Sequence, residues 1–154
     1  MRYATVMANY LNPDALGFLL TDGARLLRAA FEKRIADAGL NITPGEARTL
    51  VQVAAVDGSR QLDIAQRMGV EPMTVCTFLD KLQAEGLIER QQDPSDRRAK
   101  KIVLTERSAA TLKAINTEIE GLIAEATQGM SAETRAAMEA GLNQLRENLQ
   151  KNDR

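Results

Sequence analysis

Gln92–Lys101, which reads QDPSDRRAKK, is the stretch that decides the fold of this chain. Its Asp-Pro-Ser-Asp segment is rich in turn-forming residues, and four cations follow within the next five positions. Runs typical of strands lie on both sides, at Leu87–Arg90 and Lys100–Leu104. The stretch therefore predicts a β-hairpin with a basic tip, which suits a narrow, anionic groove.

Two short helices are predicted directly before the hairpin, at Gln61–Met68 and Pro72–Glu85, after a break at Asp57–Ser59. Ala65 is small enough for the helices to approach each other, and Gly69 permits a positive φ in the turn between them. Two apolar side chains are expected to fill the angle between the helices, Val75 and Phe78. This pattern is typical of a helix-turn-helix, although two short core helices joined by a glycine turn share it.

A helix-turn-helix followed by a basic hairpin predicts a winged helix, whose second helix enters the major groove of DNA. The inward stripe of that helix is Val75, Leu79 and Leu82, and its outward face is Met73, Thr74, Thr77 and Lys81. Threonines can bond to base edges and offer a methyl group to thymine, methionine can make apolar contact, and lysine suits a phosphate. Each of these side chains could also be an ordinary solvent-facing residue.

A long helix with an apolar stripe is predicted in the N-terminal part of the chain. Asn12 is expected to cap it, with Pro13 at its first position, and Gly39 is expected to end it in the left-handed conformation. The next helix begins at once, because Thr43 and Glu46 have the spacing of a capping box. Its apolar residues continue to about position 56.

Two more long helices are predicted after the hairpin. Thr105 is expected to cap the first, Gly129 to end it, and Ser131 to cap the second. Narrow apolar stripes on such helices would stay uncovered in one copy, which favours a homodimer over an intramolecular three-helix bundle. The predicted dimer interface comprises Leu16, Leu20, Met138, Leu142, Leu145 and Leu149.

Composition narrows the class of protein. The chain has one cysteine, lacks an N-terminal signal-peptide pattern and has no apolar run long enough to cross a membrane, so a cytoplasmic protein is expected. The formal net charge is −1, and binding to nucleic acid would therefore depend on local clusters of cations. Without histidine, the sequence offers no Ser-His-Asp or Cys-His system and no typical zinc site, so we expect no enzyme, cofactor or metal.

Leu79–Arg90 followed by Asp93–Thr105 resembles the MarR family of bacterial winged helix-turn-helix transcriptional regulators. The resemblance implies a mainly α fold with a small β-hairpin wing, in which residues 41–104 bind DNA and residues 1–40 and 105–154 form a helical dimerisation region. It also implies a homodimer on a pseudo-palindromic double-stranded operator. A regulator of this kind, here expected to be a repressor, would release the operator when it binds a small aromatic or phenolic effector.

By this resemblance, Asp96 would orient the wing by pairing with a neighbouring arginine. Either Arg97 or Arg98 would enter the minor groove, with Arg98 favoured, and Lys100 would support the wing on DNA. The resemblance also places an effector pocket between the dimerisation helices and the winged helix. Its candidate residues are Phe18, Asp22, Arg25 and Phe31, each of which could also belong to the core, the dimer seam or the surface.

Two departures from the family pattern leave alternatives open. Many relatives have an arginine at the position of Thr77, so this chain is expected to depend more on its wing and on DNA shape, with an operator rich in A·T pairs. Cys76 lies in the recognition helix, where oxidation would disturb DNA docking, whereas an inert, half-buried cysteine is the simpler interpretation. A thiol sensor and a winged-helix protein-interaction module are the two other functions considered.

Overall fold

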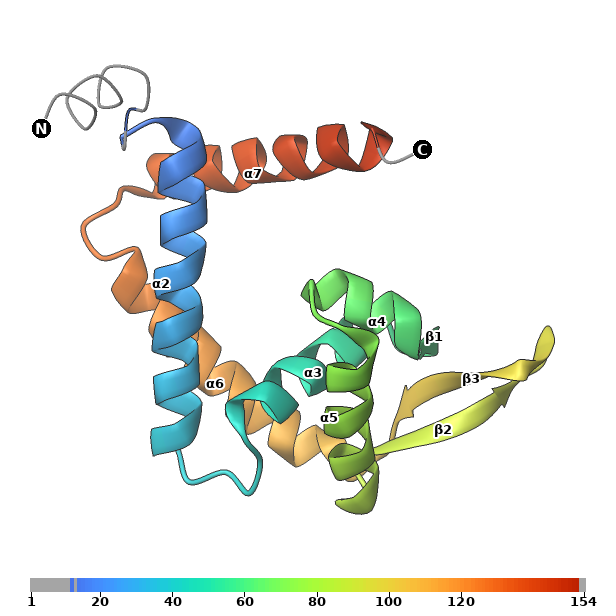
Figure 1. Ribbon diagram of the computed structural model, residues 1–154. Helices are drawn as coiled ribbons and strands as arrows, with labels where there is room; N and C mark the ends of the chain where they lie inside the picture. Colours follow the sequence, from blue (N-terminus) through green and yellow to red (C-terminus); the bar gives the residue numbers. More distant parts are fainter. Residues whose placement is uncertain (1–11, 13, 153–154) are drawn as a thin grey trace, which may run out of the picture. The chain divides into compact units, whose positions relative to one another are not determined.

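The computed structural model describes residues 12 and 14–152 (Figure 1). The helices are α2 (Leu16–Asp37), α3 (Pro44–Ala55), α4 (Gln61–Met68), α5 (Pro72–Ala84), α6 (Ser108–Ala126) and α7 (Ala132–Asn152). The strands are β1 (Ser59–Arg60), β2 (Ile88–Asp93) and β3 (Asp96–Leu104). The predicted fold class is confirmed, because a mainly helical chain carries a small antiparallel sheet that includes the wing.

The sheet has the strand order β1-β3-β2, and both pairs are antiparallel. β2 and β3 form the predicted hairpin, which extends away from the helices (Figure 1), and pairing continues to Asp93 and Asp96 beside the turn. The pairing is longer than the sequence runs indicated. β1 was not predicted at all, since its two residues belong to a segment that looked like a simple helix break.

The hydrophobic core lies beneath the helix-turn-helix and the sheet. The predicted inward stripe of α5 is confirmed, because Val75, Leu79 and Leu82 are fully buried. They pack in one cluster with side chains from α2, α3, α4, both long strands and the first half of α6, among them Ile35, Leu50, Ile64, Ile88, Ile102 and Ile115. This cluster therefore fixes the position of α5 relative to the base of the hairpin.

Gly45, in the first turn of α3, allows α5 to lie close to α3. A Cβ atom at this position would overlap the ring of Phe78 from α5. We predicted that Phe78 would fill the angle between α4 and α5, and the structure places its ring next to Gly45 of α3. The ring can approach so closely because glycine has no side chain there.

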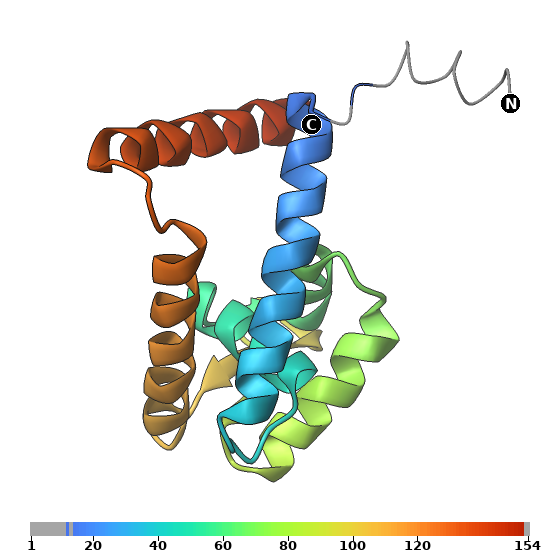
Figure 2. The same cartoon turned by 90° about the vertical axis from the view of Figure 1, so that its left-hand side faces the viewer.

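The helix caps of the predicted N-terminal part are confirmed at one site and wrong at another. Thr43 and Glu46 form the reciprocal capping box of α3, with N–H to oxygen distances of 3.2 and 2.9 Å. Gly39 has a φ of +67° in the loop of residues 38–43, which joins α2 to α3 (Figure 2). Asn12, however, does not cap α2: its side chain accepts the Asp14 N–H in a local turn, and the helix begins only at Leu16. Pro13 lies outside the described residues.

Of the two helix caps predicted after the hairpin, one is wrong and one is confirmed. Thr105 does not cap α6, because its hydroxyl donates to the Gly86 carbonyl at 2.6 Å and the helix begins three residues later, at Ser108. Ser131 does cap α7, since its Oγ accepts the Thr134 N–H at 3.1 Å. Gly129 has a φ of +84° between the two helices, as expected for a residue that ends a helix.

The chain divides into two compact units, Met1–Glu120 and Gly121–Arg154. The first half of α6 belongs to the first unit, and its Ile115 is buried in the core described above. The division into a winged helix-turn-helix at residues 41–104 and a dimerisation region at residues 1–40 and 105–154 stays a prediction. The second unit contains the end of α6 and the whole of α7. No helix within the described residues is long and apolar enough to span a membrane.

Candidate nucleic-acid interface

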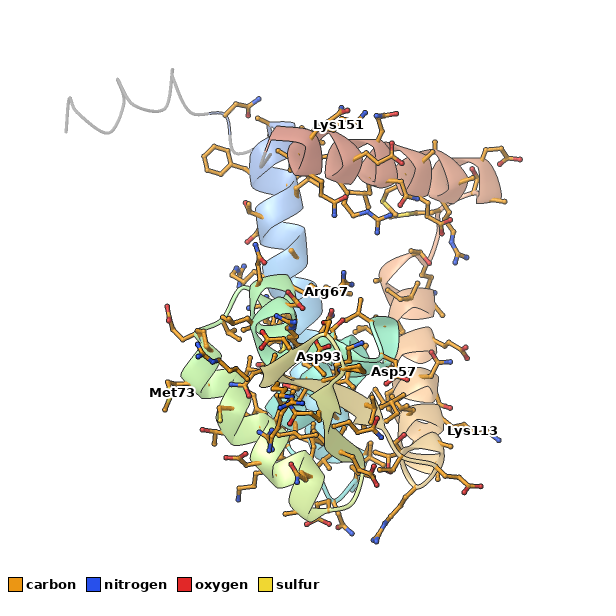
Figure 3. The ribbon with its side chains drawn as sticks, turned by 90° about the vertical axis from the view of Figure 1, so that its right-hand side faces the viewer. Asp57, Arg67, Met73, Asp93, Lys113 and Lys151 are labelled. Atoms are coloured by element: carbon orange, nitrogen blue, oxygen red, sulfur yellow. The ribbon has the colours of Figure 1, made fainter. Side chains whose placement is uncertain are left out.

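The outward face of α5 presents all four residues that the sequence assigned to it. Met73, Thr74, Thr77 and Lys81 are exposed, and Met73 is the most exposed large apolar residue of the described chain at 78%. Figure 3 shows the Met73 side chain pointing away from the helical core. A methionine side chain exposed to this degree buries little apolar surface in the fold, so it is available to a ligand of α5.

Two of these side chains, Thr77 and Lys81, have neighbours within the protein. The Thr77 hydroxyl donates to the Met73 carbonyl at 3.1 Å, so it can offer a ligand its oxygen lone pair and its methyl group. Lys81 lies near the other end of α5 and lines a hollow of about 380 Å³ together with residues of the α2–α3 loop.

A buried carboxylate anchors the tip of the wing. Asp93 is only 3% exposed, and its Oδ2 accepts hydrogen bonds from Nε and Nη2 of Arg60 at 3.0 and 2.8 Å. Its Oδ1 accepts the backbone N–H and the hydroxyl of Ser95 at 2.9 and 2.7 Å. The bonds from Ser95, together with those from Arg60, hold the pKa of the Asp93 carboxyl well below its usual range. Asp93 is therefore ionised at neutral pH and ties the hairpin tip to β1.

The predicted wing residues lie at this anchored tip. Asp96 accepts the Arg98 backbone N–H at 2.9 Å, and its other oxygen is 3.7 Å from Nη1 of Arg60. The arginine that pairs with Asp96 is thus Arg60 on β1, which corrects the expectation of a neighbour in the sequence. Arg97 and Arg98 are exposed, and their guanidinium groups make no ion pair within the described part of the chain. Lys100 is exposed on β3 as well.

A second arginine connects the wing to the recognition helix. Arg90 of β2 donates to the Asp80 carboxylate at 2.7 Å and to the Gln83 side chain, both on α5. The Arg90 side chain is 17% exposed, whereas Asp80 is 64% exposed. Because one planar guanidinium bonds to two residues of α5, it fixes how the hairpin leaves the helix.

Sequence reasoning missed Arg60, Arg90 and the role of Asp93. The Asp-Pro-Ser order carried a usable signal, because an aspartate often accepts the N–H of the residue two positions later in a turn. Nothing local pointed to Arg60, whose partner lies 33 residues away in the sequence. The two residues come close only because their strands belong to one sheet, and the strand that carries Arg60 was itself not predicted.

A family model identifies the central part of the chain. Residues 42–100, which include α3, the helix-turn-helix and most of the wing, match the model of the MarR family. This central part of the chain is thus similar to the MarR family. Members of this family are DNA-binding transcription factors and not enzymes.

Solved structures, one of them a MarR-family transcriptional regulator, match most of the chain. A regulator from Silicibacter pomeroyi is 26% identical, with a TM-score of 0.73 over 86% of this chain and 88% of that one. CouR from Rhodococcus jostii RHA1, bound to p-coumaroyl-CoA, is 28% identical, with a TM-score of 0.66 over 89% and 90%. BpsR from Bordetella bronchiseptica, whose DNA binding is regulated by 6-hydroxynicotinic acid, shares the fold at 21% identity, with a TM-score of 0.70 over 88% and 96%.

The effector candidates predicted from the sequence separate into two groups. Phe18, Asp22 and Arg25 line a hollow of about 350 Å³ on α2, where the Arg25 guanidinium donates to Asp22 Oδ1 at 2.6 Å. The described residues that line this hollow all come from one helix, so within the described part of the chain it is an open depression. Phe31 is not part of it, because its side chain packs against the hydrophobic core.

The residues of the predicted dimer interface carry exposed apolar surface. Leu16 on α2 is 69% exposed, and Leu142 and Leu149 on α7 are 43% and 58% exposed. Met138 is also exposed, and Leu20 and Leu145 are half-buried. α7 contains no buried residue among those described, which is unusual for a helix of 21 residues with a regular apolar stripe.

Cys76 is half-buried on α5. Its thiol donates to Asp80 Oδ2 at 3.9 Å, so its hydrogen-bond partner is a carboxylate. Among the described residues, no group of three or more His, Cys, Asp or Glu side chains could hold a metal ion.

Proposed function

We propose that this chain is a cytoplasmic repressor that binds a pseudo-palindromic, double-stranded operator as a homodimer. α5 would enter the major groove through Met73, Thr74 and Thr77, with Lys81 on a phosphate. The wing would follow the backbone into the minor groove through Arg97 or Arg98, supported by Lys100.

The pattern of paired and unpaired charges carries this proposal. Three acidic side chains near α5 and the wing are held by internal arginines: Asp93 and Asp96 by Arg60, and Asp80 by Arg90. Arg97 and Arg98 have no such partner in the described chain. The wing therefore presents net positive charge at one tip of a protein whose formal net charge is −1, as a phosphate-binding surface requires.

A homodimer is supported by the exposed apolar stripes of α2 and α7. A second copy would cover the same residues on both chains, which is how a two-fold interface is built. It would also place two recognition helices on one duplex, and a pseudo-palindromic operator would match that symmetry.

Regulation by a small molecule is supported by the CouR and BpsR comparisons. We propose an aromatic or phenolic effector that binds better to a form of the dimer unable to contact both half-sites. A coupling of about 1–3 kcal/mol would lower operator affinity by about 5- to 150-fold. The depression formed by Phe18, Asp22 and Arg25 could form one wall of such a pocket if another segment or a second copy covered it.

Salt dependence tests the proposed function. We expect the purified protein to bind DNA that flanks its own coding region, or a duplex selected from a random pool. Affinity should fall on the order of 10³-fold between ~50 and ~200 mM salt, because each cation that contacts a phosphate releases counterions. Specific binding that is insensitive to salt, or no binding to any duplex, would instead favour the protein-interaction module. The thiol-sensor alternative requires a response to oxidant that Cys76→Ser abolishes.

Asp93→Asn tests whether the anchored wing is needed. The substitution removes a negative charge next to the wing, which by itself would strengthen attraction to DNA. It also removes the ion pair with Arg60, and we expect the released wing to lower operator affinity about tenfold. Binding titrations of both proteins at one salt concentration measure the difference.

Glu89→Gln is the matched control for this experiment. Glu89 lies on the same strand, is exposed, and makes no side-chain hydrogen bond or ion pair within the described chain. Its loss of charge should leave affinity equal or slightly higher. Equal affinities of the Asp93→Asn and Glu89→Gln variants would show that the anchor does not position the wing on DNA.

A further inference from the structure

We infer that α5 recognises its operator through thymine methyl groups, with no side-chain donor pair directed at guanine. This inference rests on the proposed operator binding and specifies what the recognition helix reads. It follows from which groups the first half of α5 exposes and from which of its polar groups are already engaged.

The exposed groups of the first half of α5 are mainly methyl groups. Met73 ends in a methyl group and is 78% exposed, and Thr74 and Thr77 each add one on the same outward face. In DNA-binding helices of this type the N-terminal residues contact base edges. Thymine is the only base with a methyl group in the major groove, and apolar contact with that group distinguishes it from cytosine.

The usual means of reading guanine is missing from this part of the helix. A guanine contact normally uses arginine or lysine, which donates to both O6 and N7. Pro72–Asp80 contains no arginine, lysine, asparagine or glutamine. Lys81 follows eight residues after Met73, which is about 12 Å along a helix.

Three polar side chains on α5 are engaged within the protein. Asp80 and Gln83 both accept hydrogen bonds from Arg90. The Thr77 hydroxyl gives its hydrogen to the Met73 carbonyl, so it can only accept from a base. Apart from the Thr74 hydroxyl, which makes no hydrogen bond within the described chain, apolar contact through Met73 and the threonine methyl groups is therefore the main base-specific interaction that the first half of this helix offers.

Uracil substitution in the operator tests the inference. A duplex would be selected with the wild-type protein from a randomised pool, and then synthesised with uracil in place of one thymine at a time. Uracil keeps the base pair and lacks only the methyl group. At one or more positions in each half-site we expect about fourfold weaker binding, the factor expected for one buried methyl group.

Met73→Ala separates a direct contact from an effect on DNA shape. The discrimination between thymine and uracil should disappear at the position that Met73 contacts, whereas a shape effect would persist in the variant. Met130→Ala is the matched control, because Met130 is an exposed methionine outside α5 and the wing. This control should discriminate as the wild type does.

The possible results distinguish the inference from the function on which it rests. Tight, salt-sensitive binding with equal affinity for thymine and uracil at every position would overturn the inference and leave operator binding intact. An invariant guanine that depends on an α5 side chain would overturn it as well. Failure to enrich any duplex would contradict operator binding, and the inference would fail with it.

Discussion

Replacing both wing-tip arginines is expected to weaken operator binding about 100-fold or more at a fixed salt concentration. Arg97→Ala/Arg98→Ala removes two exposed guanidinium groups that have no ion-pair partner in the described chain, so the fold loses no salt bridge. The slope of log affinity against log salt concentration should also become shallower by about 2, because two fewer phosphates are neutralised. Titrations at several salt concentrations measure both quantities.

Loss of positive charge alone must be separated from loss of the wing contact. Lys113→Ala/Arg135→Ala removes the same charge from exposed positions outside α5 and the wing, and this variant should keep affinity within a few-fold of wild type. Of the single wing variants, Arg98→Ala should have the larger effect, because the Arg98 backbone is held by Asp96 at 2.9 Å. If both double variants bind alike, the wing does not contact DNA.

Placing charge on the apolar stripe of α7 is expected to convert the proposed dimer to a monomer. In Leu142→Glu/Leu149→Glu, two exposed leucines of the predicted seam become carboxylates that would face their own copies across a two-fold axis. Operator affinity should then fall by about 100- to 10,000-fold, because the second half-site is no longer held by the same particle. Light scattering reports the mass, and a binding titration reports the affinity.

Ala136→Glu/Gln144→Glu is the matched control for the dimer experiment. These positions lie on the opposite side of α7 and are exposed, and the variant gains the same negative charge. It should remain a dimer and bind DNA almost as wild type does. A Leu142→Glu/Leu149→Glu protein that is still dimeric would exclude this stripe of α7 as the dimer interface.

Most of the fold could be predicted from local patterns in the sequence. The capping box of Thr43 and Glu46, the left-handed Gly39 and Gly69, and the basic hairpin are each decided by residues within a few positions of one another. Such features depend on backbone conformation and hydrogen bonds that a short segment provides by itself. The inward stripe of α5 was predictable for the same reason, since its spacing is that of one helix face.

The parts that escaped prediction depend on residues far apart in the sequence. Thr105 looked like a helix cap, but its hydroxyl bonds to Gly86, which the hairpin brings next to it. The partner of Asp93 is Arg60, which lies on a strand of two residues that exists only because β3 is beside it. Tertiary contacts of this kind override local preference, and one sequence gives no sign of them.

Arg60 and Arg90 together fix the distance between α5 and the tip of the wing in each chain. Arg60 joins the start of α4 to the hairpin tip, and Arg90 joins the hairpin to α5, so the span from recognition helix to wing is set by two guanidinium groups. In the proposed dimer, each recognition helix and its wing would therefore contact one half-site as a rigid unit. Any change in the distance between the two units would have to come from the region that connects them, and an effector bound there would change operator affinity most.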